Sequence, residues 1–408
     1  MKNKKNIFQL YLMMLMQYFI FAVWWVPFAA YLSNNLQLDV FHTSIILCAM
    51  AIGSMASPFI GFIADRHFPA QKVLAVLNLL TALLLFVAAQ QTAFFGLMIT
   101  ITLVMLCYMP TWSLTGSIAM THTAAEQFPR VRLMGTIGWV ASGAFSLAAV
   151  HIFKVEIFDG TSLPLYCGAV AGLFAAATNL FLPDTPSSRN KTEKLSVKDI
   201  LGLRTLSTVK NKNFNMFILI SFLAIIPFTL YHVYGSMFFA DEQIGNITVT
   251  MNWGQVAEML FLFITTAILI KFGFKTTFLF GLIAMLLRYL SFYMGIKFGQ
   301  QWWYSIGILT HGLIFGLFFV GGQVYTDKVV PKEIRAQAQG FLAFIIWGVG
   351  YLAGTLSNGW LIGYFRTGEK CDWSVVFMVS MIFTILLIAL LMTLFKSKRI
   401  GSPLDSHK

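Results

Sequence analysis

Charged residues are scarce in this chain. Asp, Glu, Lys and Arg make up 11% of its 408 residues, whereas 58% are hydrophobic. A soluble globular domain carries about 25% charged residues, so the composition excludes an ordinary soluble enzyme or binding domain. The net charge of +12 does not indicate nucleic acid as a partner, because the basic residues alternate by loop between apolar runs.

Cysteine is rare as well, and no metal-binding pattern is present. The four cysteines are Cys48, Cys107, Cys167 and Cys371. They show no CxxC or metal-ligand spacing, and three lie in apolar segments as small hydrophobic residues. No Ser–His–Asp set or phosphate-binding glycine loop stands out. The sequence therefore predicts no metal, no cofactor and no enzyme.

Apolar runs long enough to cross a bilayer are abundant. They predict an all-α membrane protein with twelve transmembrane helices. The first run follows the basic N-terminus without a small-residue cleavage site, which predicts a retained helix instead of a signal peptide. The predicted spans are 7–33, 43–64, 72–90, 93–119, 131–153, 164–182, 213–239, 248–270, 276–296, 302–325, 336–364 and 373–395.

The basic residues assign an orientation to these spans. Of the 28 Lys and Arg residues, 23 fall in segments that lie on the same side as the N-terminus, and four fall in the opposite loops. The remaining one, Arg288, lies within the ninth span. Cytoplasmic loops are enriched in Lys and Arg. We therefore expect both termini in the cytoplasm of a multi-pass cell-membrane protein, in a bacterial inner membrane.

A long polar connection divides the chain near its middle. It predicts an N-terminal six-helix bundle (1–182), a cytoplasmic linker (183–212), a C-terminal six-helix bundle (213–395) and a cytoplasmic tail (396–408). The stretch FPRVRLMG at 128–135 returns in outline as VPKEIRAQAQG at 330–340. Such a repeat indicates a transporter built from two pseudo-symmetric halves, with its site between them near the midplane of the membrane.

One inner loop resembles a motif of the major facilitator superfamily, G-x-x-x-D-R-x-x-x-x-(R/Q)-K. The matching residues are Gly61, Asp65, Arg66 and Lys72. The resemblance implies the major facilitator fold. The acid would cap a neighbouring helix and the two cations would hold the cytoplasmic side together, as a conformational latch. The alternative is an ordinary basic loop.

The stretch MNWGQVAEMLFLF at 251–263 places a carboxylate, Glu258, inside an apolar helix. An ionised carboxylate at the bilayer centre costs about 2.5–3.5 kcal/mol on insertion scales, and such a group usually faces a cavity or a proton path. Gln255 lies on the same helix face. We therefore expect both side chains in a central cavity. The alternative is a glutamate that only joins two helices by a hydrogen bond.

Other polar and aromatic residues share helix faces within the predicted spans. They are Arg132, Thr136 and Trp139 in the fifth span, Thr229 and His232 after Pro227 in the seventh, His311 and Phe315 in the tenth, and Gln17 and Trp24 in the first. Arg132 could instead be an anchor at the membrane edge, and an intramembrane histidine could be a satisfied donor between helices. Aromatic planes with a few hydrogen-bonding groups suit a neutral ring-shaped solute such as a nucleoside or a sugar.

Several stretches together resemble the nucleoside:proton symporter family of the major facilitator superfamily. They are YMPTWSLTGSIA (108–119), FPRVRLMGTIGW (128–139), FLPDTP (181–186), WGQVAE (253–258) and IRAQAQG (334–340). The resemblance implies that Arg132, Thr136 and Trp139 contact the nucleoside. It also implies that Gln255 and Glu258 bind ribose and take part in proton coupling, and that Phe315 is the aromatic of the tenth helix.

The chain departs from that family at two places. Relatives carry Gln and Asn where this chain has Thr229 and His232, and an Asp follows the aromatic of the tenth helix where this chain has Gly316. The loss leaves Glu258 as the one carboxylate well inside a predicted span. His232 or His311 could supply a replacement titrating group, since histidine changes charge near neutral pH.

The sequence thus predicts a secondary active transporter that imports nucleosides, or similar neutral polar solutes, with protons by alternating access. Its expected partners are the small solute, protons and the lipid bilayer, with the protein as a monomer. A sugar permease and a proton-independent uniporter are the alternatives that Gly316 leaves open. A membrane sensor is less expected, because the 183–212 segment is too short for an output domain.

Overall fold

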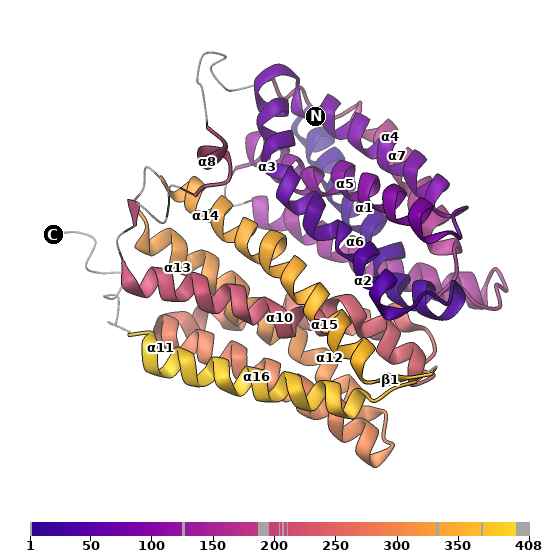
Figure 1. Cartoon of the computed structure of the whole chain (residues 1–408). Helices are drawn as coiled ribbons and strands as arrows, with labels where there is room; N and C mark the ends of the chain where they lie inside the picture. Colours follow the sequence, from indigo (N-terminus) through magenta and orange to yellow (C-terminus); the bar gives the residue numbers. More distant parts are fainter. Residues whose placement is uncertain are drawn as a thin grey trace.

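The computed structural model describes residues 2–124, 127–186, 196–203, 205, 208–209, 211–331, 334–368 and 370–396. Apart from one two-stranded hairpin, the regular elements of this part of the chain are helices (Figure 1). Ten of its helices are long and apolar enough to cross a membrane, and a shorter apolar helix covers Leu163–Asn179. The prediction of an all-helical membrane protein is confirmed, while the count of twelve spans stays a prediction.

The described part of the first half forms seven α-helices. They are α1 (Lys2–Ala30) with a π-helical extension η1 (Tyr31–Asn35), α2 (Val40–Leu47), α3 (Ala49–His67), α4 (Ala70–Ala88), α5 (Phe94–His122), α6 (Phe128–His151) and α7 (Leu163–Asn179). Asp39 precedes α2 as its N-cap, and its side chain accepts a hydrogen bond from the backbone N–H of His42. This N-cap satisfies a free N–H group of the first turn.

The second half contains the longest helix and two π-helical interruptions. A short helix, α8 (Val197–Ile200), lies in the connection before it. The elements of the second half are α10 (Lys212–Asp241), α11 (Ile247–Phe298), α12 (Trp302–Ile314), η2 (Phe315–Val320), α13 (Gly321–Val329), α14 (Arg335–Ala343), η4 (Phe344–Gly350), α15 (Tyr351–Tyr364), β1 (Arg366–Thr367), β2 (Lys370–Cys371) and α16 (Trp373–Leu394). Helix α11 covers two predicted spans, 248–270 and 276–296, and Gly273 interrupts it with φ 76° and ψ 175°. Residues with side chains avoid positive φ, so glycine permits this break.

Short loops join successive helices, so the helices run back and forth and the bundle has two ends. At one end, which we name the terminal end, Asn213 Nδ2 donates to the carbonyl of Lys396 over 2.7 Å, and Gln9 Nε2 donates to that of Phe181. At the opposite end, the far end, the Tyr304 hydroxyl donates to Glu242 over 2.6 Å. These contacts hold helix ends together that are distant in the sequence.

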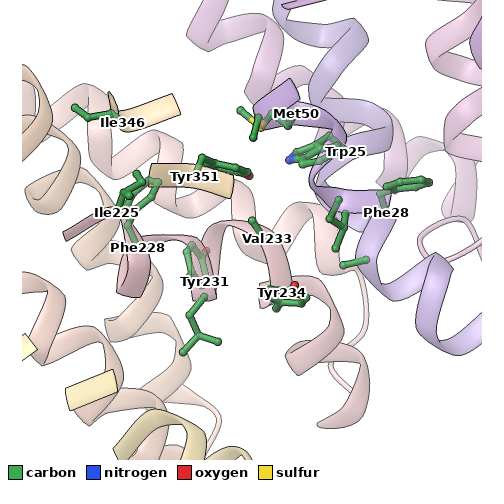
Figure 2. Close-up of a cluster of buried hydrophobic side chains, with 14 of the residues drawn as sticks. Trp25, Phe28, Met50, Ile225, Phe228, Tyr231, Val233, Tyr234, Ile346 and Tyr351 are labelled. Carbon is green, nitrogen blue, oxygen red and sulfur yellow. The ribbon is translucent and has the colours of Figure 1, made fainter. Parts of the chain in front are cut away.

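The helices of each half gather together, and the two groups meet along a central face (Figure 1). Contacts across that face join α1 to α10, α2 to α15, α3 to η4 and α6 to α11. One hydrophobic cluster takes side chains from both groups (Figure 2), among them Trp25, Phe28 and Met50 of the first half and Tyr234 and Tyr351 of the second. Because this core is shared, side chains of both halves can reach a site that lies between them.

Candidate substrate cavity

A cavity of about 220 Å³ lies between the two halves. Its first-half lining comes from α1, α5 and α6, and its second-half lining from α10, α11 and the helices from α12 to η4. The lining residues are Tyr18, Trp112, Arg132, Thr136, Trp139, Phe228, His232, Gln255, Glu258, His311, Phe315, Phe319, Gln323, Gln339, Leu342, Ala343, Ile346 and Trp347. The cavity therefore contains ionisable, amide and aromatic groups at one place.

Eight of the residues singled out from the sequence lie in this lining. They are Arg132, Thr136, Trp139, His232, Gln255, Glu258, His311 and Phe315. The other three are not part of it, because they bond or pack within their own half. Gln17 Nε2 donates to the Thr111 hydroxyl over 2.5 Å. Thr229 donates to the carbonyl of Ile226 over 2.8 Å, and Trp24 is buried among neighbouring rings of α1.

A carboxylate, an imidazole and an amide meet at the centre of the cavity. Gln255 Nε2 lies 3.1 Å from Nε2 of His311, and the same imidazole nitrogen lies 3.8 Å from a carboxylate oxygen of Glu258. Glu258 and His311 are both buried. When Gln255 donates its amide hydrogen to His311 Nε2, the neutral imidazole carries its own proton on Nδ1. The three groups thus form one polar unit that a proton or a solute can engage.

Two glycines bring these groups together. A Cβ on Gly254 would lie 3.1 Å from the Cβ of His311, and a Cβ on Gly312 would lie 2.5 Å from the backbone nitrogen of Glu258. Real side chains essentially never reach 2.5 Å. Small residues let membrane helices approach closely, so α12 packs directly against the first segment of α11 here. This close packing explains how His311 reaches Glu258.

The first half contributes a cation held over an aromatic ring. The guanidinium carbon of Arg132 lies 4.4 Å from the ring centre of Tyr18, and Tyr18 stacks on Trp112 with ring centres 5.7 Å apart. A guanidinium over a tyrosine face is stabilised by the ring quadrupole. Arg132 and Glu258 therefore place opposite charges in one cavity, contributed by opposite halves.

Flat side chains of the second half form an aromatic wall. His232 stacks on Phe228 at 5.3 Å and His311 stacks on Phe315 at 6.2 Å between ring centres. Nδ1 of His232 is also hydrogen-bonded to the Tyr351 hydroxyl at 3.0 Å, which fixes the ring. Stacked and edge-on aromatic groups favour a planar ring as their partner. This wall suits a heterocyclic solute.

Sequence reasoning did not single out several lining residues. They are Tyr18, Trp112, Phe228, Phe319, Gln323, Gln339, Leu342, Ala343, Ile346 and Trp347. One signal was available for Gln339, because it lies in the repeated IRAQAQG stretch. Its Nε2 donates to the carbonyl of Gln323 over 2.7 Å. Both glutamines lie near the terminal end, where the side chain of Gln323 is exposed.

Gly316 does not line the cavity, because Thr265 occupies the adjacent space. A Cβ on Gly316 would approach the Thr265 hydroxyl more closely than real side chains do. Thr265 is buried and donates to the carbonyl of Phe261 over 3.1 Å. A larger side chain at 316 would have to displace this threonine. Gly316, where the family has an Asp, is thus packed against Thr265 of α11.

Two further predictions concern other parts of the chain. In the loop motif, Lys72 is exposed and Gly61 is half-buried, whereas the side chains of Asp65 and Arg66 lie outside the described residues, so the latch stays a prediction. Within the described residues, no group of three or more His, Cys, Asp or Glu side chains could hold a metal ion.

Comparison with known proteins shows the family. A family model described as Nucleoside H+ symporter matches residues 4–399. The chain is 35% identical over 361 residues to the putative nucleoside transporter YegT of Escherichia coli, covering 87% of this chain and 84% of that protein. It is 28% identical over 391 residues to the xanthosine permease of Escherichia coli, with 91% of each chain covered.

The fold agrees with a solved transporter of similar length. The crystal structure of the nucleoside transporter NupG superimposes with a TM-score of 0.85 at 24% identity, covering 96% of this chain and all of that one. The relatives and the fold are those of transporters and not of enzymes. With its apolar helices, the protein is a multi-pass protein of the cell membrane. The chain belongs to the nucleoside H+ symporter family.

Proposed function

We propose that the protein imports nucleosides together with protons through the central cavity, by alternating access. The observation that carries this proposal is the Glu258–His311–Gln255 unit inside a cavity lined by both halves. A titrating acid at the interface of two halves can release a proton and a solute when the halves rock. The names of the similar proteins, a putative nucleoside transporter and a xanthosine permease, support the substrate class.

The cavity's size and lining support a single small heterocyclic solute. Small-molecule sites measure about 300–1,000 Å³, and this cavity of about 220 Å³ lies below that range, so it has room for one small solute only. We propose that the base lies against Trp139 and Phe315, near Arg132 and Thr136, and that the ribose hydroxyls bond to Gln255 and Glu258. Each of these side chains lines the cavity.

Proton coupling is assigned to Glu258 with His311 as its partner, and His232 is a second candidate. Protonation of Glu258 from outside would remove a buried charge and allow a neutral solute to bind beside it. Release of the proton to the cytoplasm would restore the carboxylate next to His311. A unit charge that crosses the membrane gains about 2.3 kcal/mol per 100 mV, which biases the cycle inward by tens of fold.

The proposed architecture is two six-helix bundles, 1–182 and 213–395, with twelve spans and the terminal end in the cytoplasm. The excess of Lys and Arg at that end supports the orientation. The contact between Asp159 and Thr248 joins the halves on the far side of the cavity, whereas Gln323, an exposed residue near the terminal end, belongs to the lining. These observations support our assignment of an inward-facing state.

A ligand screen tests the substrate class. The purified protein is heated with nucleosides, free bases or sugars, and its apparent melting temperature is recorded. A selective binder raises this temperature by mass action, and we expect the rise with nucleosides. A rise with sugars and none with nucleosides would contradict the proposal.

A proton-independent uniporter is the second candidate. The observation that favours it is that position 316 is a glycine packed against Thr265, so no second carboxylate lies at this position. Uptake of a radiolabelled nucleoside with and without a proton uncoupler separates the two. We expect the uncoupler to abolish accumulation. Uptake that stops at equal inside and outside concentrations and is unchanged by the uncoupler would support the uniporter, because a uniporter cannot accumulate its solute against a gradient.

A further inference from the structure

A second acid, half-buried, lies at the far end of the bundle, away from the cavity. Asp159, in the segment between α6 and α7, accepts three hydrogen bonds from both halves of the chain. Its carboxylate accepts from the Ser146 hydroxyl at 3.1 Å on α6, and from the backbone nitrogen and hydroxyl of Thr248 at 2.9 and 2.7 Å on α11. Thr248 is fully buried in the first turn of α11.

This contact acts as an N-cap supplied by the other half. The first N–H groups of a helix lack partners within the helix, and its N-terminus attracts negative charge. Asn246, the residue that precedes α11, makes no side-chain cap bond. Asp159 supplies the missing acceptor across the interface. Gln255 lies about two turns and Glu258 about three turns further along the same helix.

Neighbouring contacts join the halves at the same end. Asn252 Nδ2 donates to the carbonyl of Trp139 over 3.3 Å, which ties α11 to α6 one turn after Thr248. The Tyr234 hydroxyl donates to Ser44 over 2.8 Å and ties α10 to α2. All of these bonds must break when the halves separate at the far end.

We infer that Asp159 is the positioning residue that ties the helix of Gln255 and Glu258 to the first half, and that it controls opening of the far end. The inference rests on the proposed alternating-access function. The experiment that tests it measures the conformation of the protein, so its result can be interpreted without knowing which solute is carried.

The surrounding charges leave Asp159 as the titrating group of this contact. On its own segment, His151, Lys154 and Glu156 are exposed, and Ser146 and Thr248 do not titrate. On α7, Tyr166 and Cys167 are the nearest titratable groups in the sequence, and Cys167 is half-buried.

The acids at the end of α10 are engaged elsewhere. Asp241 accepts from Trp373 over 2.9 Å, and Glu242 accepts from Tyr304. In the described part of the chain, none of these titratable groups pairs with Asp159. Asp159 is therefore the group that gains or loses a proton at this contact, and its hydrogen-bond donors, Ser146 and Thr248, are uncharged.

The pH dependence of the contact has a definite sign. Burial raises the pKa of Asp159, and the hydrogen bonds from Thr248 and Ser146 oppose it only in part. When the halves part, the carboxyl becomes solvated and its pKa returns toward about 3.9. The state with the higher pKa binds the proton more tightly. Acid at the far end therefore favours closure, and the ionised carboxylate favours opening.

A distance measurement in lipid nanodiscs tests the inference. Spin labels are attached at Phe41 and Gln300, which are exposed at the far end on opposite halves, in a variant without the four native cysteines. In the otherwise unchanged protein we expect the closed population to grow as the pH falls. Asp159→Asn mimics the protonated acid, so its closed population should stay high at every pH.

Asp159→Ala removes the acceptor and should lower the ratio of closed to open protein about tenfold, the equivalent of one strong hydrogen bond. The control Glu156→Gln changes an exposed acid of the same segment. Its closed population should change with pH as it does in the protein with Glu156 unchanged. Thr248→Val removes one donor and should lie between the parent and Asp159→Ala.

Failure of this inference differs from failure of the proposed function. The inference is wrong if the protein with Asp159 opens and closes but the closed population of Asp159→Asn changes with pH as that of the unchanged protein does. It is also wrong if Asp159→Ala leaves the closed and open populations unchanged. If the parent never opens at the far end under any condition, alternating access itself fails.

Discussion

Glu258 is the residue on which the transport mechanism depends. It is buried, it lies 3.8 Å from an imidazole nitrogen of His311, and it shares the cavity with Arg132. A carboxylate in this position is costly when charged and unpaired. Its charge state should therefore decide when the two halves can exchange positions.

The change Glu258→Gln keeps the shape of the side chain and removes the titrating proton. We expect accumulation against a gradient to fall to background, while exchange of labelled for unlabelled solute continues. The reason is that exchange needs binding and rocking but no net proton movement. Proteoliposomes with and without an imposed proton gradient measure both activities. Full concentrative uptake by the variant would exclude Glu258 as the coupling acid.

At the scale of helices, the contact between α11 and α12 sets the geometry of the cavity. Gly254 and Gly312 let the two helices approach until His311 meets Gln255 and Glu258. A methyl group at 312 would press on backbone atoms of Ala257 and Glu258, which cannot move aside as a flexible side chain can.

The change Gly312→Ala should therefore lower the free energy of unfolding by about 1–3 kcal/mol, as overpacking does, and weaken proton coupling by parting His311 from Glu258. Thermal unfolding and the pH dependence of uptake measure the two effects. Gly116→Ala in α5 is the matched control, because a Cβ there meets no atom within 4 Å. Equal stability of both variants would contradict the packing argument.

The contrast between predicted and unpredicted elements has a physical cause. Apolar runs of bilayer length become helices because backbone groups must be paired in lipid, so the all-helical fold follows from the sequence. Polar residues inside these runs stand out, which is why Glu258, Gln255 and His311, all of which line the cavity, were predicted as site residues. Phe319 and Trp347 were not predicted, because among 40 phenylalanines and 10 tryptophans the sequence does not distinguish an aromatic residue that lines a cavity from one in the core.

Polarity within an apolar run also marked residues that do not line the cavity. Gln17 and Thr229 satisfy their hydrogen bonds within their own half, as buried polar groups generally must. From sequence, such a residue resembles a ligand contact. The close approach of Gly316 to Thr265 is a tertiary contact that no local pattern indicates.

At the scale of the whole molecule, closure of the far end depends on close packing between the halves. Gly143 on α6 faces α11, and a Cβ there would lie 2.5 Å from Asn252 Nδ2 and 3.3 Å from the Cα of Val249. Gly172 on α7 is also crowded, but its neighbour is Ala82, at 2.9 Å, within the same half. The two positions separate crowding between the halves from crowding inside one.

The change Gly143→Ala should act as a wedge that shifts the protein toward opening at the far end, whereas Gly172→Ala should lower stability without changing that equilibrium. The reason is that parting the halves relieves the clash at 143 and cannot relieve the one at 172. The spin-label distance between Phe41 and Gln300 measures the open population, and thermal unfolding measures stability. An open population that rises equally in both variants would mean that the halves do not move as separate units, because only then would strain inside the first half spread to the interface.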